Sequence, residues 1–576
     1  MDDVRSLVEQ RLARAFDSVS PGADPVVRPS GRADLQANGA IAVARSLGHD
    51  PVDVAKSVVE VLDIADLCEQ VEISGNGFIN LTYASEFLAE RLAAMAADER
   101  LGVERTDRSE TVVVDYSAPN VAKEMHVGHL RTTVIGDALA RMLAFLGHDV
   151  RRENHIGDWG TPFGMLIEHL VDLGEEEAAH ELSAGDLTDF YQRARASFDT
   201  DPAFAERSRR RVVLLQSGDA ETLRLWRVLV AESIRYFDLV YQKLGVELTD
   251  DDVFGESFYN PMLPEVVEEL EAQGLLVLHE GARCVFPPGF TNRHGDPLPL
   301  IVQKSDGGYG YAGTDLAAIR YRVRQLGATR LLYVVGAPQS QHLQMCFAVA
   351  SMARWLGPGV EAVHVSFGSV LGSDHRMLAT RSGGAVKLVD LLDEAIERAR
   401  SAIAQRREVD PNNAAGVDDD AVAAQVGIGA VKYADLSTDR GRDYVFDWDR
   451  MLAFEGDTGP YLQYAHARIR SIFRRGEVDV PDPVPPVLDD PHERALGLQL
   501  LGFPWALEET VATYSPHKLC GYLFEVASAF TAFYENCRVL VEDERQRSSR
   551  LTLCDLSARV LRVGLSHLGI EAPERM

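Results

Sequence analysis

The sequence predicts a multidomain protein in which an α/β core is joined to an all-α region. Its 576 residues are too many for a single hydrophobic core. Strand and helix patterns alternate over residues 106–395, and this alternation predicts a doubly wound parallel sheet. From about residue 396 onward the strand patterns fade. The C-terminal third is therefore expected to be a helical bundle.

Residues 1–105 are predicted to form a small, separate α/β domain. Alternating apolar and polar residues surround Gly75-Asn76-Gly77, which predicts a β-hairpin over residues 71–82. Amphipathic periodicity predicts helices over residues 4–16, 38–47, 51–62 and 84–97.

The core is expected to begin with a βαβ unit. The apolar run 111–116 predicts a strand, the amphipathic stretch 130–146 a helix, and residues 149–154 a second strand. A long insertion, helical and irregular, is expected over about 161–310. Another apolar strand is predicted over residues 331–335.

Beyond the core, a helical connector over about 396–450 and a helical domain over 451–576 are expected. Asp418-Asp419-Asp420 and the proline-rich segment 480–486 predict exposed breaks between helices.

Composition alone argues against a nucleic-acid binder, because the formal net charge is −30. Net charge governs solubility and long-range repulsion, however, and does not describe local patches. Basic clusters do occur, and they comprise Arg207, Arg209, Arg210 and Arg211; Arg320, Arg322 and Arg324; and Arg468, Arg470, Arg474 and Arg475.

No run of about 18 apolar residues occurs, so no transmembrane helix is expected. The six cysteines are scattered without CxxC spacing. This pattern predicts reduced, mostly buried thiols of a cytoplasmic protein and no zinc site.

The most informative segment is residues 120–129, where the first strand of the core turns into its helix. His126 and His129 are three residues apart at the predicted helix start. Helix N-termini attract anions, and imidazoles can donate hydrogen bonds to phosphate oxygens. Gly128 lacks a Cβ, so a flat ring could approach the backbone there. A nucleotide site is one interpretation, and a packing or metal-binding pair of histidines is the alternative.

Segment 120–129 resembles the HIGH signature of class I aminoacyl-tRNA synthetases, with Val127 in the variable position. Segments 117–133 and 154–161 resemble arginyl-tRNA synthetases, and the resemblance runs nearly from end to end. It implies a Rossmann-like catalytic core, an N-terminal domain that contacts the tRNA elbow, and an anticodon-binding helical bundle.

The resemblance also implies the reaction. ATP, accompanied by Mg²⁺, and L-arginine would form arginyl-adenylate and pyrophosphate. The arginyl group would then pass to the 3′-terminal ribose of tRNA(Arg), with release of AMP. No permanent cofactor, resident metal or membrane partner is expected, and the protein is expected to be a cytoplasmic monomer.

Such a reaction needs positive charge and hydrogen-bond donors on the phosphates. The expected ATP-binding residues are His126, Gly128 and His129. Class I enzymes usually carry a second signature with a lysine, yet Ala379 stands where that lysine is expected. Many arginyl enzymes instead carry a lysine just before the first signature, and Lys123 matches it. Arg376 and Arg381 are further candidates in the second loop.

Recognition of arginine calls for buried negative charge and a flat surface for the guanidinium. Tyr311 and Asp315 are four apart, so a helical turn would align them on one face. By resemblance both line the arginine pocket, and Glu256 matches a second guanidinium carboxylate. The alternative interpretation of this tyrosine and aspartate is an ordinary surface pair at a helix start.

The α-amino and carboxylate groups of the substrate require other contacts. Asn120 and Gln339 resemble the residues that hold them, and an amide can both donate and accept. Asp115, at the end of the first core strand, is another candidate.

Two other functions stay open from the sequence alone. One is a specialised duplicate that forms the adenylate without charging tRNA. The other is a catalytically inactive RNA-binding or regulatory protein. Retention of His126, His129, Lys123, Tyr311 and Asp315 together argues against the second.

Overall fold

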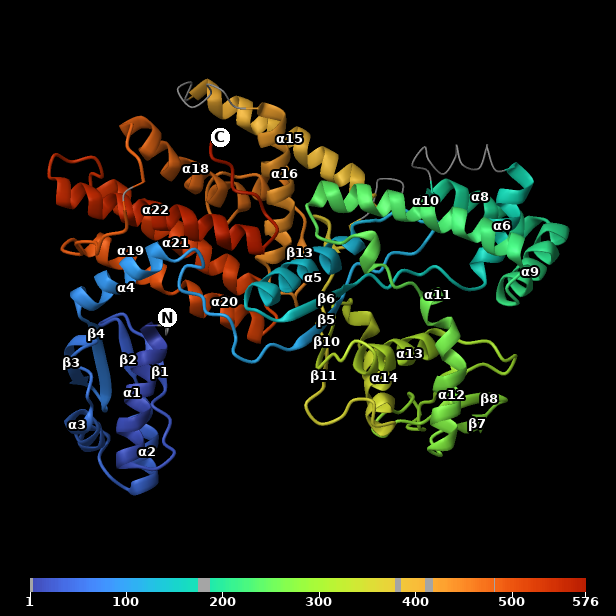
Figure 1. Ribbon diagram of the computed structural model, residues 1–576, viewed down its shortest axis with the longest axis horizontal. Helices are drawn as coiled ribbons and strands as arrows, with labels where there is room; N and C mark the ends of the chain where they lie inside the picture. The colour runs from blue at the N-terminus through green and yellow to red at the C-terminus, as the bar shows by residue number, and fades with distance from the viewer. Residues whose placement is uncertain (1–3, 175–186, 379–384, 410–417, 481) are drawn as a thin grey trace.

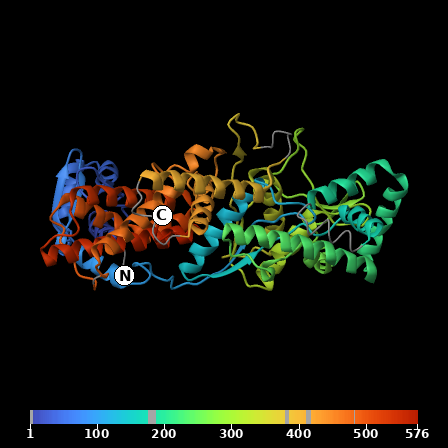
Figure 2. The same ribbon diagram turned by 90° about the horizontal axis from the view of Figure 1, so that it is seen from above.

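The computed structural model describes residues 4–174, 187–378, 385–409, 418–480 and 482–576. The small N-terminal domain lies at one end, against the C-terminal helices (Figure 1). A group of helices from the middle of the chain extends toward the other end, and the molecule is elongated in both views (Figures 1 and 2).

The N-terminal domain matches its prediction closely. Four strands form an antiparallel sheet in the order β1-β2-β4-β3, and the predicted hairpin joins β3 to β4. The strands are β1 (Val27–Pro29), β2 (Leu35–Ala37), β3 (Cys68–Ser74) and β4 (Phe78–Tyr83). All four predicted helices are present, as α1 (Val4–Val19), α2 (Gly39–Leu47), α3 (Pro51–Val61) and α4 (Ser85–Ala97).

The core contains the predicted parallel sheet. Its strand order is β11-β10-β5-β6. The strands are β5 (Thr111–Asp115), β6 (Asp149–Glu153), β10 (Arg330–Tyr333) and β11 (Glu361–His364). The chain moves from β5 to β6 in one direction and from β10 to β11 in the other. With right-handed crossovers, helices α5 (Gly128–Phe145) and α14 (Ser340–Met352) lie on opposite faces. The order reverses between β5 and β10, where open α/β sheets bind their ligands.

Helix α5 is more buried than an amphipathic surface helix would be, because 13 of its 18 residues are buried. One side packs on the sheet, and the other contacts C-terminal helices. Gly136 allows this approach, since a Cβ there would lie 2.3 Å from the Tyr116 ring. The first signature therefore lies at the start of a helix that is packed between the sheet and the C-terminal helices.

The insertion differs from its prediction in one respect. It is helical as expected, but it also holds an antiparallel sheet, β7-β8-β9. These strands have three or four residues each, too few to produce a clear alternating pattern. They are β7 (Val277–His279), β8 (Ala282–Val285) and β9 (Leu300–Gln303). The helices of this region are α6 (Pro162–Leu173), α8 (Leu187–Thr200), α9 (Pro202–Gln216), α10 (Ala220–Leu244), α11 (Glu256–Tyr259) and α12 (Leu263–Ala272). Helix α13 (Tyr311–Arg324) follows this region.

Among its described residues, the C-terminal third is helical with one exception. Tyr444–Val445 forms β13, a two-residue strand that pairs in parallel with β12 (Val370–Leu371) of the core. The prediction missed it because two residues carry no periodicity. The helices are α15 (Leu388–Val409), α16 (Asp419–Leu436), α17 (Trp448–Met451), α18 (Gly459–Gly476), α19 (Pro491–Leu501), α20 (Phe503–Ala512), α21 (His517–Asn536) and α22 (Glu544–His567).

A buried ion pair joins the core to these helices. Arg131 on α5 donates from Nε to Asp435 Oδ1 on α16 at 3.3 Å, and both side chains are at most 1% exposed. A second guanidinium nitrogen donates to the carbonyl of Arg442 at 2.8 Å. The helix that starts at the two histidines is thus fixed to α16.

The N-terminal domain docks on the bundle through charged contacts. Arg494 on α19 pairs with Asp34 at 2.5 Å and donates to the carbonyl of Tyr83 at 3.0 Å. The guanidinium of Arg5 lies 4.7 Å from the ring centre of Trp505 on α20.

Two expectations from composition concern the cysteines and membrane-spanning helices. All six cysteines are buried and free, as predicted. None of the described helices has the length and apolar character that crossing a membrane would require.

The substitution Asp435→Asn tests the ion pair. It leaves the buried Arg131 charge without its counter-ion, so we expect a loss of about 3–5 kcal/mol of stability. The measurement is the midpoint of thermal or urea unfolding of the full chain. Asp53→Asn, in the exposed Lys56–Asp53 pair, is the control and should change stability by less than about 0.5 kcal/mol. Equal midpoints for the two variants would contradict the assignment.

Candidate active site

The loop that joins β5 to α5 has a strained backbone. Ser117, Ala118 and Ala122 have positive φ angles of 73°, 48° and 58°. Residues with a Cβ rarely adopt this left-handed conformation, and each instance costs on the order of 1–3 kcal/mol. Such strain persists only where the surroundings over-determine the conformation.

Side chains from other elements supply that restraint. Each strained residue donates its backbone N–H to a side-chain oxygen at 3.0 Å. These donors and acceptors are Ser117 to Thr132 Oγ1, Ala118 to Asn154 Oδ1, and Ala122 to Ser233 Oγ. Tyr241 adds two contacts, to the Ser117 hydroxyl at 2.7 Å and to the Asn154 amide at 3.0 Å. Helix α10 of the insertion therefore helps to shape the loop.

The loop orients both histidine rings. The backbone N–H of Gly128 donates to Nδ1 of His126 at 3.0 Å. The backbone N–H of His126 donates to Nδ1 of His129 at 3.1 Å, and the ring centres lie 4.1 Å apart. Because Nδ1 accepts in each neutral ring, the proton must be on Nε2. Each ring can then offer an N–H donor to a ligand.

The pKa shifts of His126 and His129 are consistent with neutral rings. Partial burial, followed by the positive charge of Lys123, lowers the pKa of His126. Burial, followed by the neighbouring His126, lowers the pKa of His129 to about 4. Both rings are therefore neutral at pH 7, and their Nε2–H groups are hydrogen-bond donors rather than fixed cations.

Gly128 lies directly beside the His126 ring. A Cβ at this position would lie 2.7 Å from Cε1 of His126. In this structure the His126 ring occupies part of the space that the missing side chain leaves.

Lys123 is exposed beside this pair of rings. Its Nζ lies 4.4 Å from the ring centre of Tyr191 on α8. The neighbouring Glu124 pairs with Lys387 at 2.9 Å, and the backbone N–H of Val127 donates to the carbonyl of Val386 at 3.0 Å. The first signature thus lies directly against the segment that follows the second loop.

The second loop is described only in part. Arg376 is exposed at a turn in which Gly372 donates its N–H to the Arg376 carbonyl at 2.8 Å. Ala379 and Arg381 lie outside the described residues.

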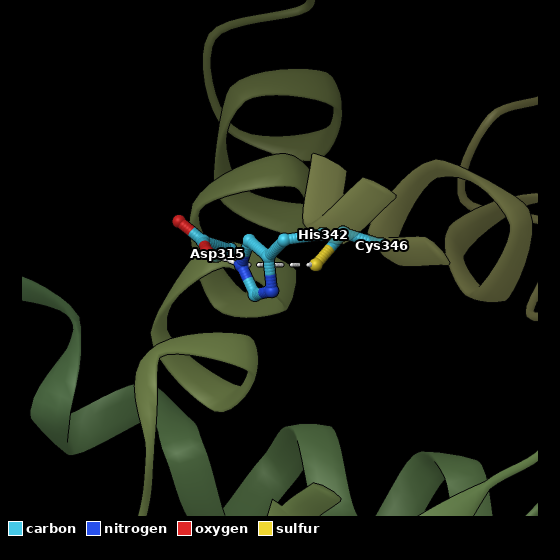
Figure 3. Close-up of side chains that lie close together, drawn as sticks. All are labelled: Asp315, His342 and Cys346. Carbon is cyan, nitrogen blue, oxygen red and sulfur yellow. Dashed lines mark hydrogen bonds and ion pairs between the residues drawn. The ribbon is translucent and has the colours of Figure 1, made fainter. Parts of the chain in front are cut away.

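Tyr311 and Asp315 lie one turn apart at the start of α13, as their spacing predicted. The Tyr311 side chain is 77% exposed, which leaves its ring available to a ligand. One Asp315 carboxylate oxygen is 2.5 Å from Nε2 of His342 on α14. Figure 3 shows this imidazole between the Asp315 carboxylate and the Cys346 thiol.

Glu256 shares the electrostatic environment of Asp315. Burial, then the charges of Asp158 and Asp315, raises the pKa of Glu256 to about 7. Asp158 is itself held by Ser257, whose backbone N–H and hydroxyl donate at 2.8 and 2.6 Å. Three carboxylates therefore influence one region, which favours a cationic ligand.

Asp115 belongs to a buried ion network. Arg322, which is fully buried on α13, donates to Asp115 at 2.8 Å and to Glu153 at 2.7 Å. The two carboxylates end the adjacent strands β5 and β6. Tyr259 adds a 3.0 Å hydrogen bond to Glu153. The network fixes α13, and with it Tyr311 and Asp315, against the end of the sheet.

Asn120 and Gln339 follow the neighbouring strands β5 and β10. Asn120 forms an isolated bridge with Gly157, and its Oδ1 would lie 2.3 Å from a Cβ at that glycine. Gln339 ends a 3-10 turn just before α14 and is exposed. Both residues lie beyond the carboxyl ends of the strands, at the switch point of the sheet.

Three further residues were not predicted from the sequence. His342, in the first turn of α14, contacts Asp315. Asp158 contributes to the raised pKa of Glu256, and Arg322 anchors Asp115. His342 lies in the segment 339–342, which follows a predicted strand, whereas Asp158 lies in segment 154–161 and Arg322 in a basic cluster without an assigned role. The partners of Asp158 and Arg322 are distant in sequence.

Family models match almost the whole chain. The model "tRNA synthetases class I (R), catalytic domain" matches residues 91–448. The model "Arginyl tRNA synthetase N terminal domain" matches residues 2–83, and "DALR anticodon binding domain" matches residues 462–576.

Individual proteins are similar over their full lengths. An arginine–tRNA ligase of Thermobifida fusca is 56% identical over 99% of this chain and 98% of its own length. One from Frankia casuarinae is 50% identical over 100% and 99%. Among solved structures, arginyl-tRNA synthetase from Plasmodium falciparum has a TM-score of 0.85 at 31% identity, with 100% of both chains covered. The Thermus thermophilus structure has a TM-score of 0.80 at 26% identity, with 99% and 100% covered.

The histidine tautomers give a direct test of the loop geometry. Histidine-selective nitrogen NMR at pH 7 should show His126 and His129 as neutral rings protonated on Nε2. On acidification His129 should titrate near pH 4, because burial opposes its charged form. Substitution of each histidine by asparagine assigns the signals. An Nδ1-protonated or charged ring at pH 7 would contradict the described hydrogen bonds.

Proposed function

The chain belongs to the arginyl-tRNA synthetases of class I, and from this premise we propose how its residues carry out arginine–tRNA ligation. The reaction forms arginyl-adenylate from ATP and arginine and then transfers the arginyl group to the 3′-terminal ribose of tRNA. Adenylate formation joins the arginine carboxylate to the α-phosphorus and releases pyrophosphate. The protein's task is to position both substrates and to stabilise charge on the phosphates.

We propose that the triphosphate lies at the start of α5. The Nε2–H groups of His126 and His129 would donate to phosphate oxygens, because the Nδ1 atoms of both rings already accept backbone N–H groups. Because both rings are neutral, they provide no net charge of their own. Lys123 would supply the positive charge on the leaving pyrophosphate, with Arg376 and Arg381 as secondary candidates.

The guanidinium pocket is proposed between α11, α13 and α14. Its main support is the raised pKa of Glu256, which reflects burial together with the charges of Asp158 and Asp315. A cation that enters would relieve this repulsion. Asp315 and Glu256 would accept hydrogen bonds from the guanidinium, and the exposed ring of Tyr311 would cover its flat face.

The other end of arginine is proposed to lie at the switch point of the sheet. Asn120 and Gln339 would bind the α-amino and carboxylate groups, since each amide both donates and accepts. Asp115 has one oxygen engaged by Arg322, and we propose that its other oxygen contributes to the α-amino group.

Further parts of the proposal concern partners and organisation. ATP would act as its Mg²⁺ complex, held through the phosphates rather than by a dedicated protein cage. Contacts with tRNA(Arg) are proposed for the N-terminal domain and the C-terminal helices. A cytoplasmic monomer is proposed, with domain boundaries near residues 105, 395 and 450 and an insertion over about 161–310.

Lys123→Ala tests the phosphate assignment. Loss of a charged donor aimed at the leaving group should lower the rate of tRNA-dependent ATP–pyrophosphate exchange by roughly 10²–10³. The rate is measured with saturating arginine, together with charging of total tRNA by each amino acid.

Arg210→Ala is the matched control, because Arg210 is exposed on α9, outside the regions proposed to contact tRNA, and pairs locally with Glu206 in the described contacts. Wild-type exchange in a folded Lys123→Ala protein would overturn the role of Lys123. Exchange without charging by any amino acid would indicate a specialised duplicate.

The pH dependence of arginine binding tests the guanidinium pocket. Glu256 has a pKa of about 7 before arginine binds and must ionise to pair with the guanidinium. Below that pH, arginine binding therefore releases a proton, and affinity should rise with pH by at most about tenfold per unit. Above pH 7 the affinity should level off. Calorimetric titration of arginine between about pH 5.5 and 8, in buffers of different ionisation enthalpy, measures both quantities.

Glu256→Gln should bind arginine more weakly and with a smaller pH dependence. Because His342 beside Asp315 also has a raised pKa, the difference between wild type and variant is the decisive quantity. Glu268→Gln, at an exposed position on α12, should reproduce the wild-type profile. Identical profiles for wild type and Glu256→Gln would contradict the pocket assignment.

A further inference from the structure

We propose that Asp315, His342 and Cys346 form a binding site for a borderline-soft divalent metal ion of the Zn²⁺ class, and that this ion and arginine exclude each other. The exclusion rests on the proposed function, because it requires Asp315 to be a guanidinium ligand. The metal site itself rests only on the geometry of the three side chains.

The three ligand atoms converge. One Asp315 oxygen lies 2.5 Å from His342 Nε2, and the Cys346 sulfur lies 3.6 Å from the same nitrogen. All three ligand atoms lie within 4.8 Å of one another. Figure 3 shows the imidazole between the carboxylate and the thiol, and the mutual distances of the ligand atoms allow one metal ion to be shared after a small movement of the side chains.

The spacing is close to that of tetrahedral zinc. Bond lengths of about 2.3 Å to sulfur, 2.0–2.1 Å to nitrogen and 2.0–2.2 Å to oxygen place neighbouring ligand atoms roughly 3.4–3.6 Å apart. The sulfur–nitrogen separation of 3.6 Å already matches this value. The oxygen–nitrogen separation of 2.5 Å is shorter, so the carboxylate must rotate outward by about 1 Å.

Two packed helices carry the three ligands, and two of the ligand side chains are partly exposed to solvent. His342 and Cys346 are four residues apart on α14, so the helix places both on one face. Asp315 comes from α13, which packs against α14. Cys346 is fully buried, while the side chains of Asp315 and His342 are 22% and 29% exposed. A metal ion can therefore arrive from solvent over the two exposed ligands.

The ligand set favours this class of metal. A thiolate, an imidazole and a carboxylate suit Zn²⁺ or Co²⁺ and are unsuited to Mg²⁺, which prefers oxygen ligands. Three protein ligands leave a fourth position for water. Binding would release the thiol proton of Cys346, and any proton on His342, to solvent.

Occupancy would close the guanidinium pocket by using the same carboxylate. Asp315 cannot pair with a guanidinium while its oxygen is bound to a metal ion. With the thiol proton released, the charges of the carboxylate, the thiolate and the divalent ion cancel, so the site would also lose its attraction for a cationic substrate. The six cysteines have no CxxC spacing, which predicted that no zinc site would be present.

The test uses the full chain and Co²⁺ as the spectroscopic probe, without ATP, which would chelate the metal. Wild type should take up Co²⁺ with the visible bands of a four-coordinate ion and a thiolate-to-metal charge-transfer band. Cys346→Ala should lose the charge-transfer band and bind at least about tenfold more weakly. Cys284→Ala, which removes a buried thiol outside the cluster, should retain the wild-type spectrum. No charge-transfer band in wild type, or an unchanged band in Cys346→Ala, would overturn the metal site.

A titration of the Co²⁺-loaded protein with arginine then tests the exclusion. Arginine should bleach the bands, whereas citrulline, which lacks the cationic guanidinium, should not. Bands that persist at saturating arginine would overturn the exclusion while leaving the metal site intact. Arginine binding by metal-free Asp315→Asn distinguishes the causes. Wild-type affinity in that variant would show that the proposed pocket, and not the metal site, is at fault.

Discussion

The geometry of the proposed active site depends on a strained loop that hydrogen bonds from side chains outside the loop hold in place. The left-handed conformations of Ser117, Ala118 and Ala122 are unfavourable by themselves, and three hydrogen bonds to side-chain oxygens fix them. The acceptors come from α5, from the end of β6 and from α10 of the insertion. Helix α10 of the insertion therefore helps to fix the backbone that carries the first signature. The same loop also explains the histidine orientation, since it aims backbone N–H groups at both Nδ1 atoms.

Charge is divided between the two ends of the site. At the proposed phosphate end, the two imidazoles are neutral, so the positive charge would come from Lys123 and from the backbone dipole of the helix start. At the proposed guanidinium end, burial, followed by the charges of Asp158 and Asp315, raises the pKa of Glu256 to about 7. Between them, Arg322 neutralises part of the charge on Asp115 and Glu153 and fixes α13 to the sheet. The −30 net charge of the chain therefore says little about either end.

The sequence was informative wherever a pattern is local. The hairpin around Gly75-Asn76-Gly77, the first βαβ unit and the helical spacing of Tyr311 and Asp315 all depend on neighbours in the chain. Contacts between segments that are far apart in the sequence could not be predicted. The pairing of β12 with β13, the sheet β7-β8-β9 and the approach of His342 to Asp315 arise from tertiary packing of short segments. Gly128 illustrates an intermediate case, because its identity indicated a close approach but could not identify the imidazole that makes it.

The contact between the two ends of the chain bears on how the protein is made. Arg494 follows Asp34 by 460 residues, yet the two side chains form one ion pair at the interface between the N-terminal domain and the bundle. At ribosomal rates of about 5–20 residues per second, Asp34 would wait on the order of tens of seconds for this partner. Throughout that interval the first domain is folded or folding with its docking face open to water and to chaperones. The first part of the enzyme to emerge is therefore among the last to reach its final surroundings.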